Sequence, residues 1–201
     1  MKQYRYVKSN AFTSGESLGN PAACIFTGQE ELTPEQMQAI AAEHKGFVIE
    51  VLFCSQSDVA DCKLSYYSSE CEVEFCGHGT IATMYTMVKE TPELMAKPVI
   101  TAETNRKGII EVFNAIEEED AVYITAPAPI EHPMILSATH IEDALSLPHR
   151  VICKEFPKGG PITIEQGGNN RIFNSVKLKC QDDKVLFGGK ATKKIDGKYY
   201  L

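Results

Sequence analysis

The segment from residue 72 to residue 88 constrains the fold most strongly. A short β-like stretch runs through two glycines, Gly77 and Gly79, into a helical pattern. Apolar side chains recur in this helix at i, i+3, i+4 and i+7, at Ile81, Met84, Tyr85 and Val88. The other faces carry the small uncharged side chains of residues 82, 83 and 86. A helix that is not polar on any broad face is typically buried, so we expect a sheet to enclose it.

The remaining pattern contains many strands and a single further long helix. Thr33 is expected to cap this helix, with Pro34 at its first position, Gln36 completing a capping box, and an end near Lys45. A short helix is predicted over 139–147. Strands are predicted over 4–8, 22–26, 50–54, 63–67, 108–115, 121–127, 162–164, 176–180 and 185–187. This pattern predicts an α+β fold with helices enclosed by mixed or antiparallel sheet.

Two turns are also predicted. The acidic run from Glu117 to Asp120 is expected to be a solvated turn between two strands, without a functional role. Asp196-Gly197 is typical of a two-residue hairpin turn, here between the last two strands.

Charge and cysteine content exclude several functional classes. The formal net charge is −7 and the chain has no basic cluster, which argues against nucleic acid as a partner. No apolar run approaches the roughly 20 residues of a membrane span, and the first residues lack a signal-peptide core. Seven cysteines without a disulfide-type spacing indicate a reduced, cytoplasmic protein. Cys54, Cys62, Cys71 and Cys76 do not form a Cys-x-x-Cys pair, so we expect no metal site.

The turn from Cys76 to Thr80 is the strongest candidate for chemistry. Glycines allow a ligand to approach the backbone, and the free N–H groups of a first helical turn favour a carboxylate or phosphate. His78 would hold or shuttle a proton beside such an anion, and Cys76 would gain thiolate character at the helix start. The alternative is an ordinary glycine turn with a buried cysteine and a packed histidine.

Glu50 is the second candidate, because it begins an otherwise apolar strand. A carboxylate among apolar neighbours suits general acid–base catalysis. The alternative is a glutamate at a strand end that points into water. Two glycine-rich turns, at 19–21 and 166–171, each either donate backbone hydrogen bonds to a ligand or serve only as turns.

Together these segments resemble the phenazine-biosynthesis-like (PhzF) family. The resemblance rests on Phe12, Gly19-Asn20-Pro21-Ala22-Ala23, residues 72–83 and Ile164-Glu165-Gln166-Gly167, in the order of the family. The His-Lys-Gly-Phe-Val-x-Glu-Val stretch at 44–51 is similar to one branch of it. The similarity covers residues 1 to about 147 and resumes near Gly160.

This resemblance implies a diaminopimelate-epimerase-like fold, in which a highly curved sheet wraps a central helix in each of two domains. It implies a complete first domain over 1–130 and a shortened second domain over 131–201. It also implies cofactor-independent proton transfer on a small carboxylic acid, with Glu50 as acid and base and His78 as its cleft partner. The residues expected to bind substrate are Asn20, Cys76, Gly77, Gly79, Thr80, Gln166 and Gly167.

The resemblance also offers a second mechanism. Related epimerases and racemases use two facing cysteines, and Cys76 matches the first of them. Cys153 and Cys180 are the candidates for the second, but neither lies in a comparable glycine turn, so two-thiol racemisation is disfavoured. The Asp-Pro-x-Thr-Gly-Ser segment that closes the family's cleft has no counterpart between Pro148 and Gly160. The chain is therefore expected to be an isomerase completed by a homodimer, a carboxylate-binding module without turnover, or a shortened form without activity.

Overall fold

The computed structural model describes residues 1–15, 17–30, 32–126, 162–167, 173–181 and 184–201. The helices are α1 (Pro34–Glu43), α2 (Gly77–Glu90), α3 (Pro92–Met95) and α4 (Ile116–Glu119). The strands are β1 (Gln3–Ala11), β2 (Asn20–Gly28), β3 (Glu50–Ser55), β4 (Cys62–Ser68), β5 (Glu72–Val73), β6 (Val99–Thr104), β7 (Gly108–Ala115), β8 (Ala121–Thr125), β9 (Ile162–Gln166), β10 (Asn174–Gln181), β11 (Lys184–Gly189) and β12 (Ala191–Tyr200).

The twelve strands of the described residues belong to one mixed sheet. Its order is β12-β1-β2-β3-β4-β6-β7-β8-β11-β10-β9, with β5 paired to β4. The pairs β2–β3 and β4–β6 are parallel, and the remaining pairs are antiparallel. The predicted α+β class with a large mixed sheet and few helices is confirmed.

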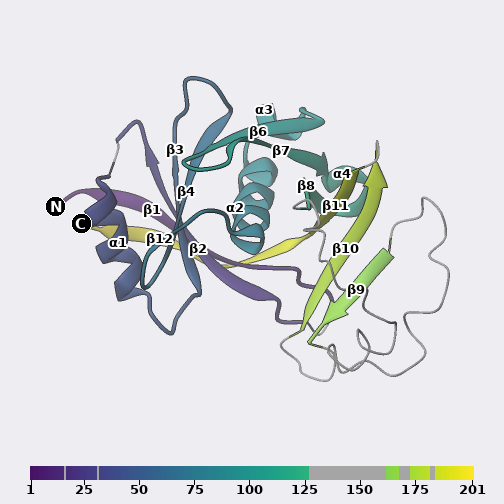
Figure 1. The fold of residues 1–201 in the computed structure, drawn as a ribbon, viewed down its shortest axis with the longest axis horizontal. Coiled ribbons are helices and arrows are strands. Elements are labelled where there is room, and N and C mark those ends of the chain that lie inside the picture. Colours follow the sequence, from purple (N-terminus) through teal and green to yellow (C-terminus); the bar gives the residue numbers. More distant parts are fainter. Residues whose placement is uncertain (16, 31, 127–161, 168–172, 182–183) are drawn as a thin grey trace, which may run out of the picture.

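The helix α2 lies in the concave side of this sheet (Figure 1). It packs against β1, β2, β3, β8 and β12, so strands from both halves of the strand order reach it. Ile81, Met84 and Val88 are fully buried, and the small residues at 82, 83 and 86 are buried as well. The prediction of a helix enclosed by sheet is confirmed.

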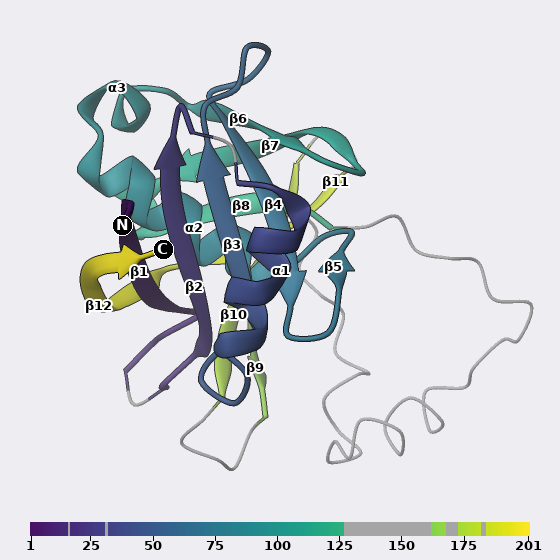
Figure 2. The ribbon, with the colours of Figure 1, turned by 90° about the vertical axis from the view of Figure 1, so that its left-hand side faces the viewer.

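The opposite face of the first strands is covered by α1 (Figure 2). Thr33 caps α1 through a complete capping box with Gln36, as predicted. Leu32 and Met37 flank this cap and are both buried in the cluster beneath α1. The sheet is therefore buried on both faces near β3, with α2 on one side and α1 on the other.

Two predicted turns differ from the structure. Residues 196 and 197 lie inside the continuous strand β12, where Asp196 pairs with Val7 and Gly197 with Tyr6, so the predicted hairpin turn is wrong. Asp196 is held there by Arg5, whose guanidinium donates to its carboxylate at 2.8 Å. The acidic run forms the helical turn α4 and ends at Asp120 with a left-handed φ of 49°.

The structure describes only some of the helices and strands predicted for the second half of the chain. The strands β9, β10 and β11 confirm the strands predicted over 162–164, 176–180 and 185–187. The helix predicted over 139–147 and the domain boundary at 130/131 lie outside the described residues, so both stay predictions. The strand β12 pairs with β1 along its length, and the C-terminal residues thereby complete the sheet around α2.

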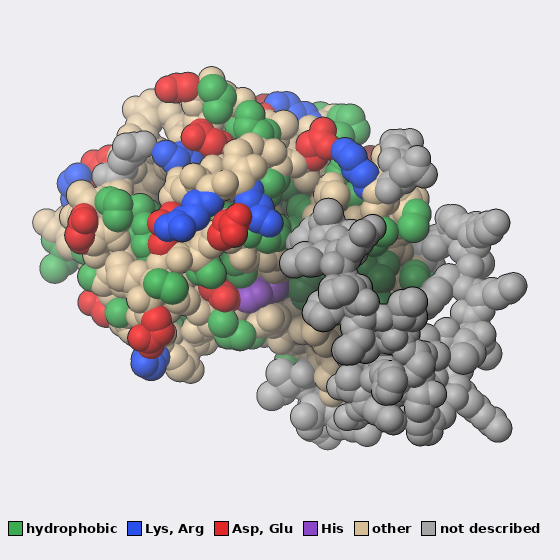
Figure 3. All heavy atoms as spheres, in the orientation of Figure 1, with side chains coloured by type: hydrophobic (Ala, Val, Ile, Leu, Met, Phe, Trp, Pro, Cys, Tyr) green, Lys and Arg blue, Asp and Glu red, His purple; other side chains and the backbone are tan. Residues whose placement is uncertain are grey.

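Charge on the surface is mixed. On the face drawn in Figure 3, Lys and Arg side chains lie beside Asp and Glu side chains. Glu90, for example, pairs at 2.7 Å with both Arg5 and Lys193. Among the described helices, none combines the length and the apolar character that a membrane crossing requires.

Candidate functional site

The alternation of side chains along β3 decides where Glu50 points. Leu52 and Cys54 belong to the core around α2, whereas Val51 and Phe53 belong to the core beneath α1. Because side chains alternate between the faces of a strand, Glu50 shares the face of Leu52 and points toward α2. The alternative of a glutamate in water is wrong, because its side chain is only 16% exposed.

Asn20 reaches the same end of the sheet. Strands β2 and β3 are parallel, with Ala23 beside Val51, so Asn20 and Glu50 both lie at the N-terminal ends of these strands. Ala22 and Cys24 face α2, and the alternation therefore turns Asn20 to that face as well. Asn20 is partly exposed, and Gly19 before it has a φ of +66° and no room for a Cβ.

Cys76 fixes the start of α2. It is the N-cap residue, and its Sγ accepts a hydrogen bond from the Gly79 amide at 3.3 Å. The Thr80 hydroxyl donates to the Cys76 carbonyl at 2.8 Å and lies 3.0 Å from the hydroxyl of Tyr66. These contacts hold the helix start against β4, so the backbone around His78 is rigidly placed.

The two glycines of the turn are needed for packing. A Cβ at Gly79 would lie 2.4 Å from Leu52 Cδ1, and one at Gly77 would lie 2.9 Å from Phe187 Cζ. Since Gly79 already donates to Cys76, its amide is engaged within the chain. Gly77 brings α2 against β11, which was not anticipated from the sequence.

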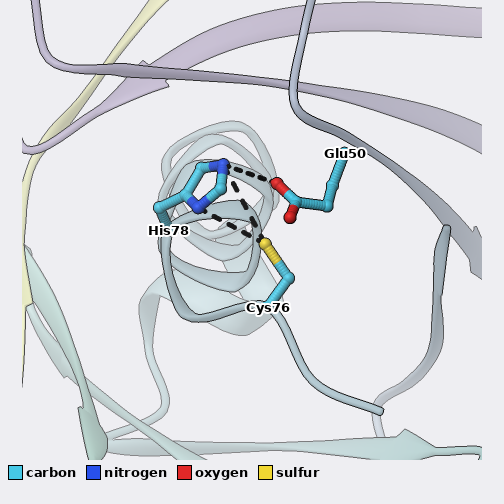
Figure 4. Close-up of side chains that lie close together, drawn as sticks. All are labelled: Glu50, Cys76 and His78. Carbon is cyan, nitrogen blue, oxygen red and sulfur yellow. Dashed lines mark hydrogen bonds and ion pairs between the residues drawn. The ribbon is translucent and has the colours of Figure 1, made fainter. Parts of the chain in front are cut away.

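Glu50, Cys76 and His78 converge at the start of α2 (Figure 4). His78 Nε2 lies 3.2 Å from Glu50 Oε2, and His78 Nδ1 lies 3.4 Å from Cys76 Sγ. The side chain of His78 is 13% exposed, so the pair is largely shielded from water. The predicted pairing of Glu50 with His78 is therefore present in the geometry.

One carboxylate oxygen of this pair lacks a hydrogen bond. Glu50 Oε2 is buried and accepts no hydrogen bond from the described residues, although His78 Nε2 is close. The contact is thus a close approach of the two side chains without hydrogen-bond alignment. A buried acceptor left unsatisfied is energetically costly, and a bound water, an ion or a reacting group would remove that cost.

The predicted thiolate character of Cys76 is wrong. Burial raises the pKa of the Cys76 thiol, and the nearby Glu50 carboxylate raises it further. The thiol therefore stays protonated at neutral pH and can donate to His78 Nδ1. In a neutral imidazole, an accepting Nδ1 leaves the hydrogen on Nε2, the atom that faces Glu50.

Gln166 and Gly167 lie at the end of β9, away from the convergent trio in the strand order. Both are exposed, and Gln166 Oε1 accepts a hydrogen bond from Asn174 at 3.1 Å. The same hairpin touches the loop before Asn20, since the Ser175 amide donates to the Phe12 carbonyl at 2.8 Å. Gly167 has a φ of 98°, and the rest of the turn predicted over 166–171 lies outside the described residues.

Tyr66 is the supporting residue that sequence reasoning missed. It is 2% exposed, and its hydroxyl anchors Thr80 while its ring packs against Phe75. Burial raises the pKa of this phenol, so it remains a neutral hydrogen-bonding group. The alternation in residues 63–67 predicted the strand, but it contains no signal that assigns Tyr66 to the helix start.

A family model and the related sequences point to the same protein family. The model of a family described as "Phenazine biosynthesis-like protein" (PhzC-PhzF) matches residues 9–196. The "Uncharacterized isomerase YfhB" of Bacillus subtilis is 30% identical over 159 residues, which cover 78% of this chain and 52% of the relative. The "Uncharacterized isomerase YddE" of Escherichia coli O157:H7 is 38% identical over 188 residues, which cover 88% of this chain and 57% of the relative. The chain spans about half the length of the curated relatives it matches.

Solved structures show the same fold. The PhzF-family protein of Bacillus anthracis aligns over 100% of both chains with a TM-score of 0.74 at 18% identity. A predicted epimerase, PA4716 of Pseudomonas aeruginosa, aligns over 98% of this chain and 99% of its own with a TM-score of 0.65 at 12% identity. These likenesses confirm the expected epimerase-like architecture.

Proposed function

Because the chain belongs to the phenazine biosynthesis-like (PhzC-PhzF) family, we propose that it is an isomerase that shifts a proton between carbon atoms of a small carboxylic acid. Relatives that carry the name isomerase support the reaction class. The observation that carries the proposal is the buried Glu50 Oε2, which accepts no hydrogen bond from the described residues and lies 3.2 Å from His78 Nε2.

Glu50 is the proposed acid and base. Its free oxygen takes the proton from a substrate carbon, and the electron pair of the broken C–H bond delocalises toward the substrate's carboxylate or double bond. The same oxygen then returns the proton to another carbon, so atoms and charge balance over the cycle. A site with little water favours these proton transfers, and the 16% exposure of the Glu50 side chain lets its carboxyl proton exchange with solvent, so deuterium from D2O enters the substrate.

His78 and the helix start are proposed to bind the substrate's anionic end. His78 presents Nε2 beside Glu50, where it orients the substrate or relays the proton. The amides of Gly77 and His78 at the start of α2 favour a carboxylate. Asn20 lies near the same end of the parallel strands and is proposed as a further ligand, as are Cys76, Gln166 and Gly167 from the family motifs. The amide of Gly79 and the hydroxyl of Thr80 bond within the chain, so these two motif residues are proposed to support the binding turn.

The reaction needs only acid–base groups of the chain in this proposal, and the partner is a second copy of the chain. Ile164 of β9 and Val185 of β11 are 44% and 48% exposed, and burial of such apolar side chains favours a homodimer. Sedimentation that gives a monomer at high concentration would count against this dimer.

A carboxylate-binding protein without turnover is the second candidate. It is favoured by Gln166, which is exposed and hydrogen-bonded to Asn174 within its own hairpin instead of facing Glu50. In this case the helix start holds a small acid, but no group from the second half completes the acid–base site.

Deuterium incorporation from D2O separates the two candidates. The protein is incubated with a panel of amino acids and of unsaturated or hydroxylated ring acids, and NMR records both exchange and ligand line broadening. Exchange that requires protein supports the isomerase, whereas broadening without exchange supports the binding protein. Glu50→Gln should abolish exchange, and Glu74→Gln, which changes an exposed glutamate two residues before Cys76, should not.

A further inference from the structure

Three side chains of different chemistry point to one spot at the start of α2. A carboxylate oxygen of Glu50, the sulfur of Cys76 and a ring nitrogen of His78 lie within 4.8 Å of one another (Figure 4). We propose that this trio binds a thiophilic divalent cation, with Zn²⁺ the best match. The proposal goes beyond the proton shift, because the site would bind the ion with or without substrate.

The distances suit the bonding of zinc. Zinc binds nitrogen and oxygen at about 2.0–2.2 Å and sulfur at about 2.3 Å, so ligand atoms of a tetrahedral site lie roughly 3.3–3.5 Å apart. Here the Glu50–His78 separation is 3.2 Å and the Cys76 Sγ–His78 Nε2 separation is 3.9 Å. Shifts of about 1 Å in the side chains would therefore place all three atoms around one ion.

The unsatisfied oxygen is an independent reason to expect a cation. Glu50 Oε2 is buried without a hydrogen bond from the described residues, and a bound cation would supply the missing partner. The Glu50 and His78 side chains keep 16% and 13% exposure, which leaves access for the ion and for one water as fourth ligand.

The backbone holds the trio in place. Cys76 is the N-cap of α2, His78 lies in its first turn, and Glu50 begins a strand of the same buried sheet. Sulfur and imidazole ligands favour zinc over magnesium or calcium, which prefer oxygen ligands. On binding, the ion replaces the thiol proton, which leaves to solvent.

The Cys-x-x-Cys spacing rule does not detect this site, because only one of its three ligands is a cysteine. The ligands lie at residues 50, 76 and 78, so a search for paired cysteines does not find them. The ion would occupy the carboxylate proposed as the base, and Zn²⁺ is therefore expected to block proton exchange.

Cobalt(II) is the probe for the binding test, because its complexes with thiolate show a charge-transfer absorption. Chelator-treated protein titrated with Co²⁺ should develop this band at one equivalent, and added Zn²⁺ should bleach it. Cys76→Ser should lose the band while keeping the helix cap, since serine is a favoured N-cap residue. Cys71→Ser, which removes an exposed thiol, should keep the band. Absence of the band in the wild type, or its loss in Cys71→Ser alone, overturns the proposal.

A second measurement, of zinc binding by the wild type and by Glu50→Gln, tests the site without the cysteine variant. Zn²⁺ should raise the midpoint of thermal unfolding of the wild type, because an ion that binds the folded state stabilises it. Glu50→Gln should weaken zinc binding by about tenfold or more. An unchanged zinc affinity in Glu50→Gln contradicts the site.

The binding test and the activity test fail separately. Metal binding without any proton exchange leaves the zinc site in place and removes the isomerase proposal. Exchange that continues at saturating Zn²⁺ contradicts the shared use of Glu50, whereas exchange that stops and returns with chelator supports it.

Discussion

Gly79→Ala tests whether the helix start is packed as tightly as the structure implies. The new Cβ would lie 2.4 Å from Leu52 Cδ1 and 2.9 Å from Cys76 Sγ. Carbon atoms in contact ordinarily lie about 3.5–4.0 Å apart, so the overlap with Leu52 is about 1 Å. Overpacking of this kind costs about 1–3 kcal/mol.

The helix propensity of alanine offsets part of that loss. Alanine is favoured over glycine by up to about 1 kcal/mol inside a helix. The net expectation is a destabilisation of roughly 1–2 kcal/mol. For a chain of this size, each kcal/mol lowers the melting temperature by roughly 2–4 °C.

Urea unfolding followed by circular dichroism measures the effect, since the chain has no tryptophan for fluorescence. Gly197→Ala is the matched control, because a Cβ there meets nothing within 4 Å. Combining Gly79→Ala with Leu52→Ala should cost less than the sum of the single changes, because the shortened side chain makes room. If Gly79→Ala is as stable as the control, the packing argument for this glycine is refuted.

Three further outcomes are expected. Cys76→Ala should lose about 1 kcal/mol of stability relative to Cys76→Ser, because only serine replaces the N-cap acceptor; equal urea midpoints would contradict this role. Because burial raises the pKa of Cys76, thiol reagents at neutral pH should label Cys71 and Cys180 and leave Cys76 unlabelled, as peptide mapping can check; rapid labelling of Cys76 would show that its thiol is accessible and reactive. Arg5 holds the pKa of Asp196 below its ordinary value, so this carboxylate contributes stability above the unfolded pKa of about 3.9 that is lost as pH falls through the lower folded pKa. Asp196→Asn should therefore cost under about 1 kcal/mol near pH 7, with screening by water, and a difference from wild type that persists in strong acid would refute the sign.

The elements with local signals were predictable from the sequence. The capping box at Thr33 and the apolar stripe of α2 are encoded within a few residues, and both helices form where predicted. The enclosure of α2 also followed, because its faces lack a polar side that would suit water.

Elements decided by distant partners were not predictable. Asp196-Gly197 has the composition of a hairpin turn, yet both residues pair with β1 within a continuous strand and Arg5 binds the aspartate. Likewise, the acidic run becomes α4, and its Glu119 is held by Lys179 at 3.2 Å on β10. Strand β6 (Val99–Thr104) was not among the predicted strands, although its burial alternates along the strand and it pairs with β7 (Gly108–Ala115).

The candidate site was predictable in its membership and less so in its chemistry. Glu50 and His78 were paired by resemblance, and the alternation along β3 gives the physical reason they meet. Its position at a helix start predicted a thiolate at Cys76. Burial and the Glu50 carboxylate instead raise the pKa of this thiol, and their effect is the larger one. Burial depends on the whole sheet, and a local motif does not report it.

The central claim is that Glu50 moves a proton on a small carboxylic acid, and its most direct test is the rate of deuterium incorporation into the best substrate of the panel. Wild type and Glu74→Gln should exchange at equal rates, and Glu50→Gln should be slower by at least about 100-fold. Exchange by Glu50→Gln at the wild-type rate would contradict the assignment of Glu50 as the acid and base.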